Sequence, residues 1–251
     1  MLEVAGVGVR FEGVVALDDV SLTVRANQIV GVIGPNGAGK TTLFNAVSRF
    51  VTPSGGTIAY RGESLLRTPA WRLAHIGIAR TLQGLGLWPT LTVLENVMAG
   101  APDRARVAAD MLAFPTADRR IAATRSDAMS ILQELGVADR TSSLPGALPH
   151  GVQKRVIIAR ALMARPSLLL LDEPASGLSA PDVSELVELL GMLRARMAIA
   201  LVEHNVDMVL AVSDTITVLN LGRVLASGTP DEIRANEDVA TAYLGQQVAH
   251  A

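Results

Sequence analysis

Residues 29–47 read IVGVIGPNGAGKTTLFNAV, and no other segment says more about the expected architecture. Five apolar residues, as in a buried strand, lead into a glycine-rich turn that ends at Lys40 and Thr41, and an amphipathic segment follows. A Gly-x-x-x-x-Gly-Lys-Thr pattern between a strand and a helix is the phosphate-binding P-loop pattern. Its glycines let backbone N–H groups surround an anion, and the helix N-terminus adds partial positive charge. The segment therefore predicts a nucleotide site.

Two side chains of this turn have specific chemical roles. Lys40 supplies a compact cation for the β- and γ-phosphates, and Thr41 supplies a hydroxyl ligand for Mg²⁺. The chain has only two lysines, Lys40 and Lys154, among many arginines, so a lysine here indicates that a point charge is required. The residues expected to bind the nucleotide are Gly34, Pro35, Asn36, Gly37, Ala38, Gly39, Lys40, Thr41 and Thr42.

A second apolar run, LLLLDE at residues 168–173, ends in two acids. Four apolar residues fit a buried strand, and α/β sheets place their chemistry at the carboxyl ends of strands. Asp172 is expected to reach Mg²⁺ through water, and Glu173 to polarise the attacking water. The alternative is a buried strand that ends in two solvated carboxylates.

The composition fits a layered α/β protein. Of 251 residues, 49% are hydrophobic and only 3% aromatic, which suits a parallel sheet covered on both faces. Lys plus Arg number 22 against 24 for Asp plus Glu, without a long basic run, so nucleic acid is not an expected partner. The chain has no cysteine, which fits a cytosolic protein.

The sequence shows no membrane-spanning or secretory segment. A spanning helix needs roughly 18 uninterrupted apolar residues, and the best candidate, MAIALVEHNVDMVLAV (197–212), is interrupted by Glu203, His204 and Asp207. The N-terminus lacks the features of a signal peptide. The expectation is a protein that is soluble or at most peripheral to a membrane.

Together, the two motifs and their spacing resemble the ATPase subunits of ABC transporters, over nearly the whole chain. The resemblance implies an α/β P-loop NTPase of the ABC type, with an antiparallel β-region and an inserted helical subdomain. In VRFEGVVALDDVSLTV (9–24) it implies that Phe11 stacks on adenine. In IARTLQ (78–83) it gives Gln83 as a ligand of Mg²⁺ and a water sensor that also contacts the membrane subunit. Ordinary packing remains the alternative for Phe11.

Two further motifs gain roles from the resemblance. ALVEH (200–204) ends in His204, which would contact the γ-phosphate, although a lone histidine beside an apolar strand is more often structural. The catalytic set is therefore Glu173, His204 and Gln83. The segment 176–179, which follows the acid pair, is expected near a dimer interface.

The segment LPHGVQKR (148–155) departs from the family pattern. Relatives carry Leu-Ser-Gly-Gly-Gln, which closes over the γ-phosphate held by the other subunit of a head-to-tail dimer. Here Pro149 replaces the serine and His150 a glycine. Proline fits the first turn of a helix, so the N–H groups of His150 and Gly151 can still face ATP. Lys154 and Arg155 are expected to form a solvated face, and a partly exposed polar role stays open for His150.

Several phrases point to a subfamily, the ATPases of branched-chain amino-acid importers. They are IGPNGAGKTTLFN (33–45), IARTLQGLGLWPTLTVLENV (78–97), VEHNVDMV (202–209) and SGTPDEIRANEDVATAYLG (227–245). The resemblance implies membrane permease subunits, a second ATPase subunit in a heterodimer or homodimer, and indirectly a substrate-binding protein, with the chain at the cytoplasmic face of the membrane. A soluble ABC-type ATPase, for example in cluster assembly, and a non-hydrolysing regulatory partner remain as alternatives.

The resemblance also implies an organisation. Residues 1–84 and 157–251 would form the nucleotide-binding core, and 85–156 a helical subdomain with the altered signature. A helix within 120–137 is supported by apolar residues on one face and by Gly136 as a C-cap. Leu87 and Trp88 are candidate permease contacts or, alternatively, packing residues of the subdomain. The apolar face comprises Ile121, Ala128, Ile131, Leu132 and Leu135.

Overall fold

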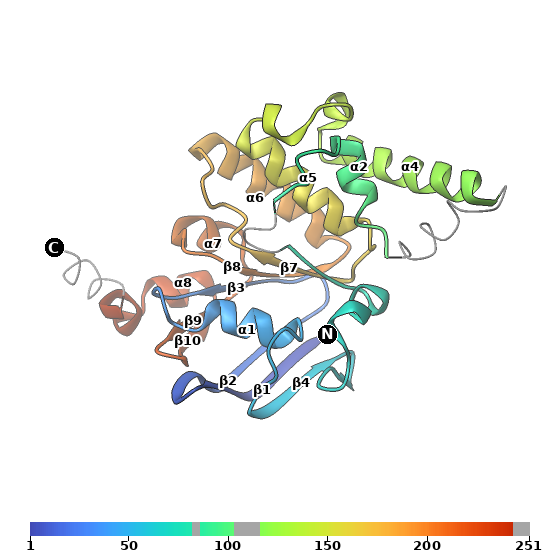
Figure 1. Ribbon diagram of the computed structural model, residues 1–251. Coiled ribbons are helices and arrows are strands. Elements are labelled where there is room, and N and C mark those ends of the chain that lie inside the picture. The colour runs from blue at the N-terminus through green and yellow to red at the C-terminus, as the bar shows by residue number, and fades with distance from the viewer. Residues whose placement is uncertain (82–85, 103–115, 243–251) are drawn as a thin grey trace.

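The computed structural model describes residues 1–81, 86–102 and 116–242. Its centre is a six-stranded sheet, parallel except for the edge strand β10, which pairs antiparallel to β9 (Figure 1). In spatial order the strands are β10 (Arg223–Gly228), β9 (Thr215–Asn220), β3 (Ile29–Ile33), β8 (Ala198–Val202), β7 (Leu168–Asp172) and β6 (Ile78–Arg80). Every residue of β3, β7 and β8 is buried, as expected for parallel strands with both faces covered.

A second, antiparallel sheet packs below the first. Its strands, in spatial order, are β2 (Val14–Val24), β1 (Leu2–Phe11), β4 (Gly55–Tyr60) and β5 (Glu63–Ser64). Helix α1 (Lys40–Val47) lies between the two sheets (Figure 1). The alternation of strand side chains divides the core accordingly: Leu168 and Leu170 of β7 join the cluster around α1, whereas Leu169 and Leu171 face the opposite helices.

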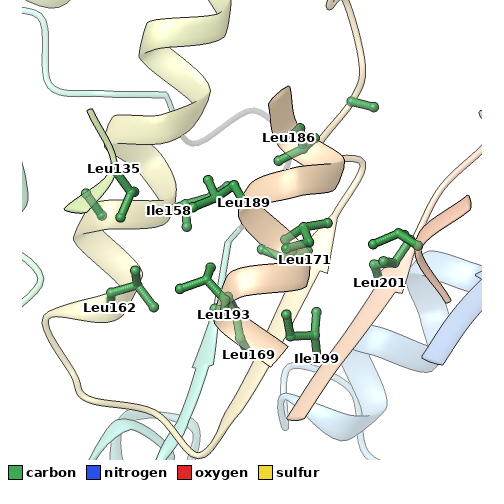
Figure 2. Packing of buried hydrophobic residues seen from close by; sticks show 14 of the residues in the cluster. Leu135, Ile158, Leu162, Leu169, Leu171, Leu186, Leu189, Leu193, Ile199 and Leu201 are labelled. Carbon is green, nitrogen blue, oxygen red and sulfur yellow. The ribbon is translucent and has the colours of Figure 1, made fainter. Parts of the chain in front are cut away.

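Further helices of the described ranges lie over the other face of the six-stranded sheet. There α2 (Val93–Met98) and α4 (Thr116–Glu134) pack on α5 (His150–Leu162), and α6 (Ala180–Arg194) packs beside α7 (Val206–Val212). Helix α8 (Pro230–Arg234) follows β10. Short 3₁₀ turns occur at Ala70–Arg72, Ala74–Ile76, Ala138–Arg140 and Pro145–Ala147. Figure 2 shows the branched side chains that fill this layer, from α5, α6, β7 and β8.

Local signals explain where several helices begin and end. Thr92 and Thr229 each form a capping box with the glutamate three residues on, and Ser179 and Asn205 cap α6 and α7. The amphipathic helix predicted within 120–137 is confirmed as α4, with Ala128 and Leu132 fully buried. Gly136 follows it in the left-handed conformation (φ 68°) expected of a C-cap glycine.

The predicted division of the chain stays a prediction. Its boundary at residue 156 falls inside α5, which packs against both α2 and α4 and also contacts β6. Buried residues of α2, α4, α5, α6 and the central sheet belong to one continuous hydrophobic cluster. Within the described ranges, no helix has the length and apolar character needed to cross a bilayer.

Candidate active site

The phosphate-binding turn joins β3 to α1, and its backbone requires glycine. Gly34, Gly37 and Gly39 all have positive φ, of 152°, 79° and 102°. A Cβ on Gly34 would lie 2.1 Å from the carbonyl oxygen of Leu219, and one on Gly39 would lie 2.7 Å from that of Ala16. The turn is therefore packed against neighbouring backbone on two sides, which fixes the cradle that the sequence predicted.

Lys40 is the first residue of α1, and its ammonium folds back over the turn. Nζ donates hydrogen bonds to the carbonyl oxygens of Gly34 (2.7 Å) and Pro35 (3.0 Å). Burial lowers the pKa of Lys40, and the negative charge of Glu173 offsets part of that effect. A buried cation held by two neutral carbonyls lacks a full counter-charge from these partners, and a phosphate group would supply it.

Strand register brings three predicted motifs to one edge of the sheet. Val202 of β8 is level with Val32 of β3 on one side and with Asp172 of β7 on the other. The P-loop starts two residues beyond Val32, and His204 lies two residues beyond Val202. The turn, the acid pair and the histidine therefore share the carboxyl edge, where open α/β sheets bind their ligands.

Asp172 has one satisfied and one unsatisfied carboxylate oxygen. Oδ2 accepts a hydrogen bond from Nη2 of Arg80 at 2.7 Å, while Oδ1 is buried and has no hydrogen-bond partner among the described residues. A buried anionic oxygen without a partner is costly, so it marks a position for a cation or its water. This oxygen fits the predicted Mg²⁺ role. The described residues contain no group of three or more His, Cys, Asp or Glu side chains arranged to hold a metal ion by themselves. This is compatible with Mg²⁺, which in nucleotide sites is bound by one or two carboxylates together with phosphates and water.

Glu173 sits on a sharp turn directly after β7. Its φ is 48°, a left-handed conformation that costs a non-glycine residue roughly 1–3 kcal/mol. Its N–H donates to the carbonyl of Val202 (2.9 Å), and its own carbonyl accepts from Lys154 (3.1 Å) and from the N–H of Ser176 (3.2 Å). Strain that is held in place by this many contacts is typical of functional positions.

The sequence analysis missed Glu203, which precedes His204. This carboxylate is fully buried and accepts hydrogen bonds from the N–H groups of Ala175 (2.6 Å), His204 (3.0 Å) and Asn205 (3.3 Å). It thereby joins the loop after the acid pair to the loop that carries His204, whose side chain is 57% exposed. The signal that could have identified Glu203 is its place in the sequence, as an acidic residue directly after the apolar run 198–202.

The altered signature begins helix α5, with two corrections to the sequence analysis. Pro149 is the residue before the helix, not part of its first turn, and its carbonyl accepts the N–H of Gln153 (3.1 Å). Lys154 and Arg155 are half-buried instead of solvated: Lys154 contacts Glu173, and Arg155 pairs with Glu185. Both reach inward because α5 packs beside the acid-pair loop and α6.

The remaining predicted site residues have fewer contacts with the rest of the site among the described residues. His150 opens α5 with its Nε2 3.3 Å from the carbonyl oxygen of Ser176, and buried Gly151 follows. Phe11 ends β1 and is 45% exposed, in keeping with a side chain that has room for a partner. Gln83 lies outside the described residues.

Comparisons with known proteins decide the family. The family model described as "ABC transporter" matches residues 17–176. The chain belongs to the ABC transporter family. A second model, described as "Branched-chain amino acid ATP-binding cassette transporter", matches residues 223–249 of the cassette.

Curated relatives and solved structures resemble the cassette over almost its full length. It is 39% identical to the high-affinity branched-chain amino acid transport ATP-binding protein LivG of Salmonella typhimurium, and 38% identical to BraF of Pseudomonas aeruginosa, with 98% of each chain covered in both cases. The ADP conformation of MJ1267, an ATP-binding cassette of an ABC transporter, superposes with a TM-score of 0.83 at 26% identity and 98% coverage of both chains.

These findings confirm the family and the fold class predicted from the sequence. ABC cassettes bind ATP and hydrolyse it to power transport, so this chain is a transport-coupled ATPase, and the soluble alternative is disfavoured.

Proposed function

We propose that the cassette is the ATPase of an importer for branched-chain or related amino acids or amides, working at the cytoplasmic face of the cell membrane. The observation that carries this proposal is the similarity to LivG and BraF over 98% of the chain, joined by the separate match of residues 223–249. That C-terminal match lies outside the hydrolytic centre, so it speaks for the kind of transporter and not only for ATP hydrolysis.

Each site residue has a role in this proposal. Lys40 and the P-loop N–H groups hold the β- and γ-phosphates, and Phe11 stacks on adenine. Thr41 and Asp172, together with Gln83, hold Mg²⁺, which when bound neutralises charge on the phosphate oxygens. The partner-free Oδ1 of Asp172 supports this assignment.

The hydrolytic step uses groups at the same edge of the sheet. Glu173 accepts a proton from the water that attacks the γ-phosphorus, and the bond to the β–γ bridging oxygen breaks. His204 donates to the γ-phosphate, and its loop is fixed by the buried carboxylate of Glu203. The constrained backbone of Glu173 supports its role as the base, because position matters as much as basicity.

The signature would serve a second ATPase subunit. Pro149 offers neither a hydroxyl nor an N–H, whereas the N–H groups of His150 and Gly151 lie at the start of α5. A partner cassette whose own signature is intact would leave the site of this chain complete. The dimer is therefore proposed to be a heterodimer, with a homodimer as the alternative.

A groove of about 300 Å³ is the proposed docking site for a cytoplasmic helix of the permease. It runs between β6, the 3₁₀ turns at 70–76, the end of α2 and α5, and Trp88 stands in its wall with the guanidinium of Arg160 5.0 Å from the centre of its indole ring. Trp88 is 42% exposed, so part of the ring remains available. Leu87, the other candidate, packs against the main hydrophobic cluster instead.

The decisive experiment is affinity purification of the tagged Glu173→Gln chain from detergent-solubilised membranes with ATP and Mg²⁺ present. We expect permease subunits and a second ATPase to be recovered, and the wild-type complex in proteoliposomes to accumulate labelled leucine, isoleucine, valine or a short amide. Recovery from the soluble fraction alone would contradict the importer. Uptake of none of these solutes by an active complex would contradict the substrate class.

Matched surface variants test the groove. Trp88→Glu places a charge in the groove and should abolish recovery of the permease. Met192→Glu, at an apolar side chain on α6 that is 59% exposed and lies outside the groove, should leave recovery unchanged. Equal recovery with both variants would move the docking site elsewhere.

A further inference from the structure

Arg80 is a buried arginine that the proposed mechanism does not use. It ends β6, and its side chain is 7% exposed. Nη2 donates to Oδ2 of Asp172 at 2.7 Å, while Nη1 donates to Oδ1 of Asn45 (2.9 Å) and to Oγ of Ser48 (3.0 Å). One side chain therefore connects the acid-pair strand to α1, the helix that follows the P-loop.

The guanidinium is also held from the sides by two rings. Its central carbon lies 5.6 Å from the ring centre of Phe44 and 5.9 Å from that of Phe50. Stacking on aromatic rings and two-sided hydrogen bonding are what the planar guanidinium group does well and an ammonium group does not. The position of Nη2, and hence of the carboxylate oxygen that it binds, is fixed by four side chains besides Asp172.

The contact is selective for one oxygen of Asp172. Oδ2 is bound by Arg80, and Oδ1 is buried without a partner among the described residues. An ion pair whose only role was stability would gain by satisfying both oxygens, because a buried unpaired acceptor is costly. Arg80 binds only one oxygen of the carboxylate, so the other oxygen can bind a further ligand in a fixed orientation.

We propose that Arg80 is the positioning residue of Asp172: it anchors Oδ2 so that Oδ1 is presented to the Mg²⁺ that accompanies ATP. This inference rests on the proposed Mg²⁺ role of Asp172. Residues that orient a metal ligand typically change metal affinity about 10- to 100-fold when they are replaced.

The test measures ATP binding in the Glu173→Gln background, where turnover does not interfere. Isothermal titration calorimetry gives the ATP affinity in EDTA and the Mg²⁺ concentration at which the Mg²⁺-dependent gain is half-maximal. For Arg80→Lys and Arg80→Gln we expect that concentration to rise about 10- to 100-fold, with the affinity in EDTA unchanged within about twofold. Arg165→Gln is the control, because Arg165 forms an exposed ion pair with Asp127 at 2.9 Å outside the site.

Three results would overturn the proposal, and they are distinguishable. If the parent binds ATP equally with Mg²⁺ and with EDTA, the proposed Mg²⁺ role itself fails. If the parent depends on Mg²⁺ and the Arg80 variants show the same half-maximal concentration, Arg80 does not position the ligand. An equal loss of affinity in EDTA and in Mg²⁺ would indicate a structural role alone.

A milder variant covers the case in which the Arg80 variants do not fold. Asn45→Ala removes one anchor of the guanidinium from a half-buried side chain and leaves the ion pair in place. The half-maximal Mg²⁺ concentration should then rise by less than in the Arg80 variants, about two- to tenfold, because Nη1 keeps its hydrogen bond to Ser48. An unchanged value in a folded Asn45→Ala chain would overturn the proposal.

Discussion

The ammonium of Lys154 on α5 donates a hydrogen bond to the backbone carbonyl of Glu173, with 3.1 Å between Nζ and O. The helix that carries the altered signature is thereby attached to the residue proposed as the catalytic base of the same chain. Burial lowers the pKa of Lys154, and the carboxylates of Glu203 and Glu173 act in the opposite direction. The contact is maintained despite this burial, because the ammonium lies between two acidic loops.

Replacing Lys154 by methionine should slow hydrolysis more than it weakens ATP binding. Methionine keeps the length of the buried stem but leaves the Glu173 carbonyl without this donor, so the strained turn becomes less well defined. We expect kcat to fall about tenfold, in line with the loss of a charge-assisted hydrogen bond, with the Kd for ATP within about twofold. Lys154→Arg should restore most of kcat, and a matching loss with Arg and Met would contradict a role for the donated hydrogen bond.

Glu173→Gln should retain ATP binding and stop hydrolysis. The amide has nearly the shape of the carboxylate but cannot accept the proton of the attacking water. We expect turnover to fall by at least about a hundredfold, the usual scale of general-base catalysis, while ATP still raises the Tm. Glu188→Gln, on the exposed face of α6, is the control. Surviving hydrolysis in Glu173→Gln would show that another group is the base.

Glu203→Ala should destabilise the whole chain. Three N–H groups in a buried site would lose their acceptor, at a cost of about 3–5 kcal/mol. For a chain of this length the Tm should fall by roughly 6–20 °C, measured by calorimetry. Glu203→Gln, which keeps an acceptor oxygen, should lose less. A Tm within about 2 °C of the wild type in the alanine variant would show that the loops around His204 do not depend on this carboxylate.

Pro149→Ser tests whether the altered signature is a functional defect. Serine would restore a hydroxyl and an N–H at the residue before α5, where the structure has neither. One hydrogen bond to a charged phosphate changes an equilibrium by about 10- to 150-fold. Because the N–H groups of His150 and Gly151 remain at the start of α5, we expect hydrolysis by the assembled dimer to change less than about a hundredfold. An inactive wild type that serine rescues would mean that the signature is broken.

Much of the fold could be predicted because its signals are local. The P-loop at 34–41, the apolar run 168–171 and the face of α4 each depend on residues close in the sequence, where spacing alone determines geometry. The relation between Arg80 and Asp172 could not be found that way, since these residues are 92 positions apart and meet only through strand pairing.

The error at Lys154 and Arg155 has a physical cause. Both residues were interpreted from the helix alone, and an isolated helix with a polar face is expected to point that face at water. The structure places α5 against the loop after β7, so a charged side chain that reads as solvated is instead half-buried against a backbone carbonyl. Glu203 was overlooked for a similar reason, because its carboxylate joins its own loop to Ala175 in a loop 28 positions away.

Gly222 connects the P-loop, β2 and the C-terminal segment through backbone hydrogen bonds, and these contacts limit where two cassettes can be recombined. Its N–H donates to the carbonyl of Ala38 in the P-loop (3.1 Å), and its carbonyl accepts the N–H of Asp18 in β2 (2.8 Å). The turn that opens the C-terminal segment is thus one wall of the ATP cradle. A chimera that exchanges C-terminal segments between cassettes must therefore retain the chain through Gly222, because a junction before this residue changes the nucleotide site together with the graft.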